Sequence, residues 1–326
     1  MTVHDLTPES ATFVQPALVA IVLTYNEEAN IERALRSIGD LCPIVVVDSG
    51  STDQTEAICR RYTQHFLVNP YQNHASQWTW ALENTPLKAD WVLALDADFE
   101  LSAELRQRLR DGLATVPPDV SGIFVIHRYV FGGADIRFGG AKKYWMRVVR
   151  RGHASPDLSD LVDFRFVVQG KTQNWNAVVR EYNELDEDAS FWIGKQDKFS
   201  LRLAVEEELR RQGALQWGTR PHLFGNADQR VMWLRDLWLR MPLFLRPCIY
   251  FTYRYFLRLG FLDGRGGFLY HAQQGFWMRL VVDWKLWQLR KLQLSPSQLQ
   301  DFCQAMLKTP SGSVRHVWTS LNATGR

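Results

Sequence analysis

Two aspartates separated by a single residue have the side chains and the spacing to hold a metal ion. Asp96 and Asp98 directly follow the apolar run at residues 91–95, so they leave the end of an expected buried strand. Two carboxylates at such a position are costly unless a cation or hydrogen-bond donors compensate their charge. Mg²⁺ and Mn²⁺ prefer oxygen ligands of this kind together with substrate phosphates. The pair therefore indicates a divalent-cation site for a phosphate-bearing ligand; the alternative is a pair that caps a helix or faces solvent.

Polar residues also follow two other expected strands. Asp48 comes after the apolar run 44–47 and opens the turn Asp-Ser-Gly-Ser-Thr-Asp, while residues 19–23 lead into Thr24-Tyr-Asn-Glu-Glu. Ligands of open α/β sheets bind outside the carboxyl ends of the strands. At that edge Asp48 could accept hydrogen bonds from a base or a ribose. Helix capping by Asn26 and Asp53 is an alternative, and it is compatible with ligand contact.

Five continuous apolar runs predict the strands that position these residues, since strands covered on both faces lack the alternation of half-exposed ones. They span residues 19–24, 44–47, 65–68, 91–95 and 122–127. Between them, helices are predicted from an apolar face over residues 31–38, from capping-box spacing near Asp53 and from a cap at Ser102. This alternation predicts an α/β fold with a mostly parallel sheet flanked by helices.

The rest of the chain is less regular. Residues 131–173 have no clean period and are interpreted as loops, either around a site or as irregular connections. A helix is predicted over residues 195–212, ending at Gly213, and the last helix is expected to begin at Ser295-Pro296.

Composition limits the class of protein. The 326 residues are 46% hydrophobic and 22% charged, as in ordinary globular proteins, and the formal net charge of +3 does not by itself indicate nucleic acid. The four cysteines include no Cys-x-x-Cys pair, which argues against structural zinc or a disulfide framework and favours a reducing cytoplasm. The first residues do not resemble a secretory signal, and no uncharged apolar run is long enough to predict a spanning helix.

Three motifs together resemble family 2 glycosyltransferases in their order and spacing: residues 19–31, 44–55 and 91–98. The resemblance implies the GT-A fold, which is Rossmann-like, together with an inverting mechanism and a nucleotide-sugar donor bound through Mg²⁺ or Mn²⁺. It is closest to the branch with lipopolysaccharide-core and exopolysaccharide transferases, where an element like residues 261–268 often occurs near the end. It also implies an N-terminal tail (1–16), a catalytic domain (17–220, with a nucleotide-sugar half, 17–130, and an acceptor half, 131–220) and a helical C-terminal region (221–326).

The resemblance implies roles for individual residues that match the motifs of the family. Asp98 would bind the metal, with Asp96 as a second ligand that also meets the ribose side of the donor, and Asp48 would bind the base. A UDP-sugar is the favoured donor. The residues expected to contact the donor are Thr24, Asn26, Glu27, Asp48, Ser51, Gln77 and Asp96.

An inverting transfer also needs a general base for the acceptor hydroxyl. The family places an acidic residue for this purpose downstream of the Asp-x-Asp motif, often within a His-Glu or Asp-His pair. The choices here, in order, are Asp163, Glu181 and Asp160, and Phe164 stands where such a histidine would follow Asp163. Three arginines could assist at the phosphates or be surface charge: Arg147, Arg150 and Arg151.

Residues 230–291 combine eleven Lys and Arg with only three acidic residues, five tryptophans and four tyrosines. Arginines with aromatic rings suit the interface of an anionic membrane. We therefore expect a peripheral attachment at the inner face of the plasma membrane, with a glycan or lipid-linked acceptor. The alternative is a helical appendage that packs its aromatic side chains on the catalytic domain. No nucleic-acid motif accompanies these residues, so no nucleic-acid partner is expected.

Two other classes of protein compete with this interpretation. A sugar nucleotidyltransferase would carry a glycine-rich basic loop after the first strand, whereas this chain has the acidic segment 24–28. A non-catalytic membrane- or nucleic-acid-binding protein would not need Asp48, Asp96 and Asp98 at strand ends. A dinucleotide-binding oxidoreductase is excluded because no Gly-x-Gly-x-x-Gly follows the first strand.

Overall fold

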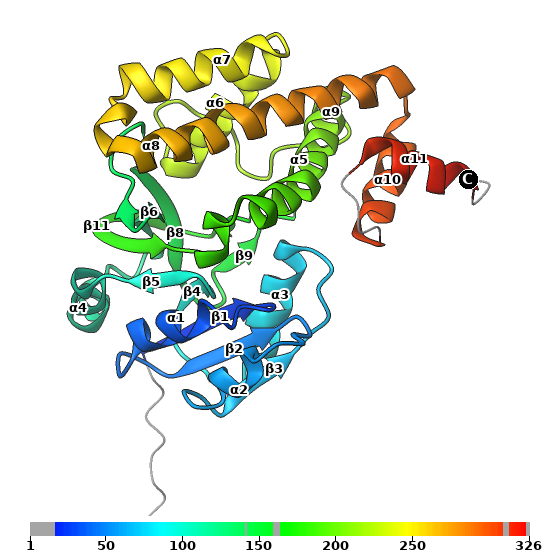
Figure 1. Ribbon diagram of the computed structural model, residues 1–326. Coiled ribbons are helices and arrows are strands. Elements are labelled where there is room, and N and C mark those ends of the chain that lie inside the picture. The colour runs from blue at the N-terminus through cyan, green and yellow to red at the C-terminus, as the bar shows by residue number, and fades with distance from the viewer. Residues whose placement is uncertain (1–16, 141, 159–163, 309–312, 324–326) are drawn as a thin grey trace, which may run out of the picture.

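The computed structural model describes residues 17–140, 142–158, 164–308 and 313–323 (Figure 1). Its centre is a nine-stranded sheet with the order β3-β2-β1-β4-β8-β6-β11-β5, in which β7 pairs with β6. Strands β1 to β4 are mutually parallel and β6 is parallel to β11, whereas β8 and β5 run antiparallel to their neighbours. The strands of this sheet are β1 (Leu18–Thr24), β2 (Ile44–Asp48), β3 (His65–Val68), β4 (Trp91–Asp96), β5 (Phe99–Leu101), β6 (Val120–Phe131), β7 (Ala134–Asp135), β8 (Lys143–Arg150) and β11 (Lys171–Glu181).

The register of the parallel strands brings the three polar motifs to one edge. Thr24 at the end of β1 lies opposite Asp48 at the end of β2. On the other side of β1, Leu23 lies opposite Asp96 at the end of β4. All residues of β1 and β2 are buried, as continuous apolar runs predict. The expected convergence of the strand ends is therefore confirmed.

Helices cover both faces of this part of the sheet. On one face α1 (Ile31–Ile38) packs through the predicted apolar stripe, beside α4 (Ala103–Gly112). On the other face α3 (His74–Asn84) buries Trp78 completely. The predicted cap of α4 is present, since Ser102 accepts a hydrogen bond from the Leu105 N–H at 3.1 Å. The short helix α2 (Thr55–Cys59) begins two residues after Asp53, which accepts from the Thr55 N–H.

The middle of the chain is more ordered than its sequence suggests. Residues 143–150, interpreted as part of a loop region, form β8 at the centre of the sheet, and two further strands pair with each other: β9 (Ala154–Pro156) and β10 (Phe166–Val168). The loop interpretation was therefore wrong there. Strand β8 carries polar and aromatic side chains such as Trp145 and Arg147, which face a cavity and hide the apolar pattern.

A layer of helices follows the sheet along the chain and lies above it in Figure 1. It begins with η2 (Glu184–Glu187) and α5 (Ala189–Arg211), the latter starting six residues before the prediction. The chain then forms α6 (Ala227–Arg240), α7 (Leu245–Thr252), η3 (Tyr253–Leu257), η4 (Gly260–Asp263), α8 (Gly264–Tyr270), η5 (His271–Trp277), α9 (Met278–Leu292), α10 (Pro296–Lys308) and α11 (Val314–Ala323). The helix predicted to be the last, at 295–296, is therefore followed by another. The mixed, mostly parallel α/β fold with a helical C-terminal region is confirmed, while the proposed boundary at 220 stays a prediction.

A buried ion-pair network holds the helical layer together. Arg246 on α7 is 1% exposed and donates from Nε to Asp283 Oδ1 on α9 at 2.7 Å. Its Nη2 donates to Glu207 Oε2 on α5 at 2.6 Å. Asp283 also accepts from the Phe244 N–H at 2.7 Å, where the backbone adopts a left-handed conformation. Removal of one partner of such a network leaves the charges of the other partners buried and without a counter-ion.

We expect Arg246→Ala to lower the free energy of unfolding by about 3–5 kcal/mol, because Asp283 and Glu207 would lose their shared cation. Urea denaturation would measure the change. Arg240→Ala is the matched control, since that side chain is 74% exposed in its pair with Asp236 and should cost less than about 1 kcal/mol. Equal effects of the two substitutions would contradict this account.

Candidate active site

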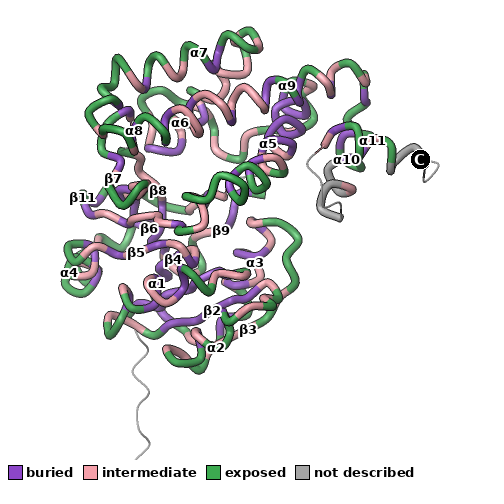
Figure 2. The backbone as a smooth tube through the Cα atoms, viewed as in Figure 1, coloured by how far each residue is buried: buried purple, intermediate pink, exposed green. Residues whose placement is uncertain are grey.

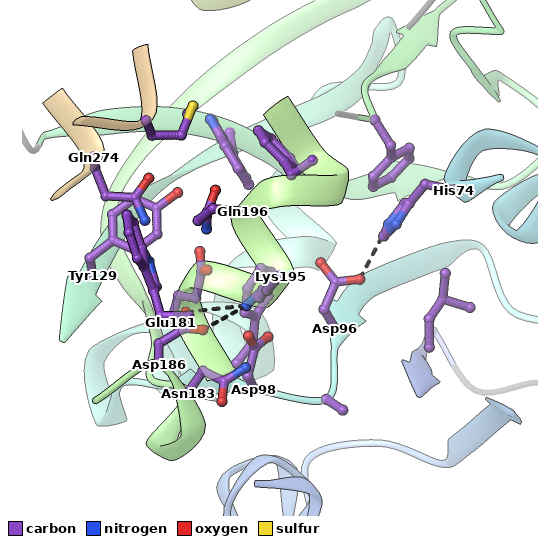
Figure 3. A pocket seen from close by; sticks show the side chains of 18 of the residues that line it. His74, Asp96, Asp98, Tyr129, Glu181, Asn183, Asp186, Lys195, Gln196 and Gln274 are labelled. Atoms are coloured by element: carbon purple, nitrogen blue, oxygen red, sulfur yellow. Dashed lines mark hydrogen bonds and ion pairs between the residues drawn. The ribbon is translucent and has the colours of Figure 1, made fainter. Parts of the chain in front are cut away.

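A cavity of about 890 Å³ lies at the edge where the parallel strands end. The sheet and its loops form one wall, and α5 with parts of α7 to α9 forms the opposite wall. Figure 3 shows side chains from both walls pointing into this space. Such a position, between a sheet edge and a second structural layer, is typical of ligand sites in α/β proteins.

The structure brings six of the predicted site residues to this cavity and leaves others away from it. The residues that line it are Thr24, Glu27, Gln77, Asp96, Asp98 and Glu181. Three residues that were predicted to contact the nucleotide-sugar donor do not line the cavity, namely Asn26, Asp48 and Ser51. Asp160 and Asp163 lie outside the described residues.

Asn26, Asp48 and Ser51 join the two loops beside the cavity. The Asp48 carboxylate accepts from the Gly50 N–H at 2.8 Å and from the Ser51 N–H at 2.7 Å. Ser51 Oγ accepts from the Asn26 N–H, and Asn26 Oδ1 accepts from the Thr52 N–H, both at 2.8 Å. These bonds fix the backbone of both loops next to the strand ends.

Asp96 is held between two basic side chains. His74 Nε2 lies 3.4 Å from one carboxylate oxygen, and Arg147 Nη1 lies 3.6 Å from the other. Burial by itself would raise the pKa of Asp96, but His74 and then Arg147 lower it below the usual value. Asp96 is therefore a stably ionised carboxylate. Nearby, Gln77 donates from Nε2 to Ser49 Oγ at 3.2 Å, which fixes its amide at the cavity wall.

The pKa values of Asp98 and Glu181 are shifted in the opposite direction to that of Asp96. Burial raises the pKa of Asp98 well above its usual value, and the carboxylates of Glu181, Glu27 and Asp96 raise it further. Burial also raises the pKa of Glu181 to about 7, against the effect of Lys195. Glu181 Oε2 lies 2.8 Å from Nε2 of the buried His127. The cavity thus holds more negative charge from carboxylates than the nearby basic side chains neutralise.

This charge fits a divalent cation that arrives with its ligand. Within the described ranges, no three His, Cys, Asp or Glu side chains converge to form a metal site by themselves. Mg²⁺ is commonly held by one or two carboxylates together with substrate phosphates, so a complete protein site is not required. A bound cation would favour the ionised form of Asp98, against the effect of burial and of the neighbouring carboxylates.

Some cavity residues could not be assigned from the sequence, because no local pattern indicates that they reach the cavity. Lys195 on α5 pairs with Asp186 at 2.9 Å and acts electrostatically on both Asp98 and Glu181 (Figure 3). His74 is the first residue of α3 and also lines the cavity. Arg147 was named but left open, and it is 2% exposed at the cavity, whereas Arg151 binds backbone carbonyls elsewhere. A cap at Asp188, which accepts from the Phe191 N–H, could have indicated the true start of α5.

The class of protein follows from the sequence matches and agrees with the site. The parallel strands end at a cavity that Asp96, Asp98 and several basic side chains line. The family model of glycosyl transferase family 2 matches residues 19–155 of the chain. That segment includes the three strand-end motifs, while Glu181 and the helical layer lie beyond it.

Relatives extend the similarity along the chain. The lipopolysaccharide core biosynthesis glycosyltransferase LpsC of Rhizobium meliloti (strain 1021) is 27% identical over 286 residues, which cover 86% of this chain and 95% of LpsC. An uncharacterized glycosyltransferase of Rickettsia bellii is 40% identical over 91 residues, which cover 28% of this chain and only 30% of that relative.

Solved structures align more loosely. Residues 1–349 of Staphylococcus aureus TarS, in complex with UDP-GlcNAc, are 14% identical and overlap 84% of this chain and 91% of that chain at a TM-score of 0.40. Glucosyl-3-phosphoglycerate synthase from Mycobacterium tuberculosis, in complex with Mn²⁺, UDP and phosphoglyceric acid, is 17% identical and overlaps 63% of this chain and 81% of that chain, also at 0.40. The family assignment therefore rests on the sequence matches.

We expect the metal-free protein to lose stability as the pH rises from about 4.5 to 7, because the folded state keeps a proton on Glu181 that the unfolded chain releases. Glu181→Gln removes the part of this loss that comes from Glu181, while Asp98, whose pKa is also raised, still contributes. In EDTA the variant should be more stable than the wild type by roughly 2–3 kcal/mol at pH 8 and equal to it near pH 4.5. Urea denaturation at both pH values measures the difference. Glu184→Gln, at a side chain that is 51% exposed, is the control and should leave the pH profile unchanged.

Proposed function

We propose that this glycosyltransferase moves a sugar with inversion from a nucleotide-sugar donor to a hydroxyl of a glycan or lipid-linked acceptor, with Mg²⁺ or Mn²⁺. The observation that carries the proposal is the pairing, in one cavity, of the carboxylate Asp98 at a strand end with Glu181, whose pKa is raised to about 7. Asp98 is suited to binding a cation, and Glu181 is suited to accepting a proton near neutral pH.

The donor would lie along the sheet edge. Thr24, Glu27 and Gln77 border the cavity there. The loops joined by Asn26, Asp48 and Ser51 lie next to it, where the base would be held. A UDP-sugar is the first donor to test.

The carboxylates of Asp98 and Asp96 would hold the metal ion together with the donor diphosphate. When bound, the cation offsets the charge that grows on the leaving nucleoside diphosphate. The protein adds fixed positive charge of its own, since Arg147 lies 3.6 Å from Asp96 and Lys195 acts on Asp98. These fixed charges favour departure of the diphosphate, so that no mobile side chain is needed to supply positive charge.

Glu181 would be the general base. The acceptor oxygen bonds to the anomeric carbon, the bond from that carbon to the diphosphate oxygen breaks, and the acceptor proton passes to Glu181. A pKa of about 7 leaves a large ionised fraction at neutral pH and still gives a strong acceptor for the proton. His127, at 2.8 Å, orients the carboxylate. Asp163 and Asp160 stay as alternatives.

A lipid-linked acceptor would require the enzyme to work at a membrane surface, and the similarity to LpsC supports a glycolipid acceptor. Within the described residues, no helix is long and apolar enough to cross a bilayer. The segment from α7 to α8 nevertheless exposes many large apolar side chains. Much of α7 is coloured as exposed in Figure 2, along the outer side of the helical layer. The large exposed apolar residues of this segment, here called the apolar surface, are Phe244, Leu245, Ile249, Tyr253, Phe256, Leu257, Leu259, Phe261, Leu262, Phe268 and Leu269.

The charge of this segment complements an anionic bilayer. Arg258 and Arg265 are exposed beside the apolar surface. The one acidic residue there, Asp263, accepts hydrogen bonds from the N–H groups of Arg137 and Phe138 at 3.0 and 2.9 Å. Exposed apolar groups with adjacent arginines suit shallow insertion among anionic head groups. We propose this attachment at the inner face of the plasma membrane.

We expect Asp98→Asn to abolish Mn²⁺-dependent binding of UDP and to lower transfer at least about 10²-fold, because the cation loses its main ligand. Glu181→Gln should keep UDP and Mn²⁺ binding but lower transfer about 10²- to 10⁴-fold. Calorimetry measures the binding, and release of UDP from UDP-sugars measures turnover. Asp40→Asn, at a side chain that is 79% exposed, is the control.

Unchanged metal-dependent turnover in Asp98→Asn would refute the metal site. Full activity of Glu181→Gln would move the base to Asp163 or Asp160, and a change of metal dependence in that variant would show that Glu181 acts on the donor instead.

We expect Leu257→Glu together with Leu262→Glu to weaken sedimentation with vesicles of phosphatidylcholine and phosphatidylglycerol at least about 10-fold, because charged side chains would replace apolar ones at the interface. Leu158→Glu, which is 69% exposed and lies outside the apolar surface, should bind vesicles like the wild type. Equal binding by all three proteins would exclude the apolar surface as the attachment site.

A further inference from the structure

Between strand β8 and the helical layer, the cavity is lined by a second group of charged and polar residues that the transfer chemistry does not use. We call it the basic wall, and it consists of Lys143 on β8, Tyr250 on α7, Arg254 on η3 and Arg279 on α9. All four line the cavity, although they come from four elements. Three cations and a phenol directed at one space can bind an anion.

Arg254 is the centre of this wall. The residue is 4% exposed, its Nε donates to the Gly139 carbonyl at 2.7 Å, and its Nη1 lies 3.5 Å from the Tyr250 hydroxyl. Its Nη2 has no hydrogen-bond partner among the described residues, and no carboxylate of those residues forms an ion pair with it. A buried guanidinium without a counter-ion is costly, which is a reason to look for an anion that completes it.

The backbone around Arg254 is built to hold it in place. Gly139, whose carbonyl accepts from Arg254, has a φ of +67°, and a Cβ there would lie 2.2 Å from the ring of His271. Only glycine fits between these groups. Arg254 itself lies in a π-helical segment, and η5, which brings Gln274 to the cavity, is a second one. Such π-helical turns are frequent at functional sites.

The positive potential acts on the neighbouring side chains. Burial by itself would raise the pKa of Tyr250, yet Arg254, Lys143 and Arg279 lower it to about 8. Burial, together with Arg254 and Lys143, lowers the pKa of His271 to about 4, so this ring stays neutral at physiological pH. The two shifts agree with a region where positive charge dominates.

A series of ring contacts connects the basic wall to the proposed base. Arg254 lies 5.6 Å from the ring centroid of Tyr270, which lies 5.3 Å from that of Tyr129. The Tyr129 ring is in turn 4.8 Å from the ring of His127, the partner of Glu181. The cations that act on Asp96 and Asp98 are different ones, chiefly His74, Arg147 and Lys195. These contacts favour an assignment of the basic wall to the acceptor side.

We propose that the basic wall binds an anionic group of the acceptor, a phosphate or a carboxylate, and so positions the neighbouring hydroxyl at Glu181. The fork of Arg254, the ammonium of Lys143 and the hydroxyl of Tyr250 provide several donors for the oxygens of one such group. The acceptor is thus an acidic sugar or a phosphorylated one. This inference rests on the proposed function, because it assumes that Glu181 faces the acceptor.

The test compares three sugars that differ in charge: glucose 6-phosphate, glucuronate and glucose. Each is titrated calorimetrically into the full-length protein with Mg²⁺ and saturating UDP, so that the donor side is occupied. We expect a charged sugar to bind and glucose to give no signal. Arg254→Gln and Lys143→Gln should each weaken that binding at least about 10-fold. Arg230→Gln, an exposed arginine of the same layer, is the control and should bind like the wild type.

Arg254→Lys and Tyr250→Phe provide independent variants if Arg254→Gln does not fold, and weaker binding of the charged sugar by both supports the proposal. Equal binding by wild type and all folded variants overturns it. Displacement of UDP by the charged sugars also overturns it, because the wall would then belong to the donor. If the wild type does not bind UDP, the proposed function fails. The same titrations without UDP then still decide whether the basic wall binds anions.

Discussion

The structure depends on how buried negative charge is tolerated at one edge of the sheet. The register of β1 with β4 brings Asp96 level with Leu23, and two residues later Asp98 joins Glu27 and Glu181 in the same cavity. Burial raises the pKa values of Asp98 and Glu181, and the neighbouring carboxylates raise them further. Arg147 from the antiparallel strand β8 and Lys195 from α5 partly offset the rise for Glu181. The irregular second half of the sheet and the first long helix are therefore integral parts of the site.

The parallel half of the fold could be predicted because its strands are buried on both faces. β1, β2, β3 and β4 agree with the predicted runs to within a residue at each end, and α1 has the predicted bounds. The prediction failed where side chains serve the cavity instead of the core. In β8 the aromatic and basic residues that line the cavity interrupt the apolar pattern, and the strand was interpreted as a loop. Residues 230–291 suggested an interfacial region, but their division into α6 to α9 follows from contacts such as Arg246 with Asp283, which join distant segments.

The same distinction applies to the site. Thr24, Glu27, Asp96 and Asp98 could be placed from the ends of their strands, because strand direction fixes where those residues go. Glu181 could be named but not ranked first, since its raised pKa depends on burial that only the assembled cavity provides. Arg254 is more than 150 residues away from the Asp-x-Asp motif along the chain, and no local pattern indicates which cavity it will reach.

Helix α5 connects the chemistry to the helical layer as one continuous element. At about 1.5 Å per residue its 23 residues span roughly 34 Å. Lys195 lies toward one end, beside Asp98 and Glu181, while Glu207 lies toward the other, bound to Arg246. A rigid helix transmits displacement along its axis, so a shift of α7 and α9 relative to the sheet would also move the ammonium group of Lys195. Because Lys195 lowers the pKa of Glu181, the acidity of this residue depends on the position of helices on the opposite wall of the cavity.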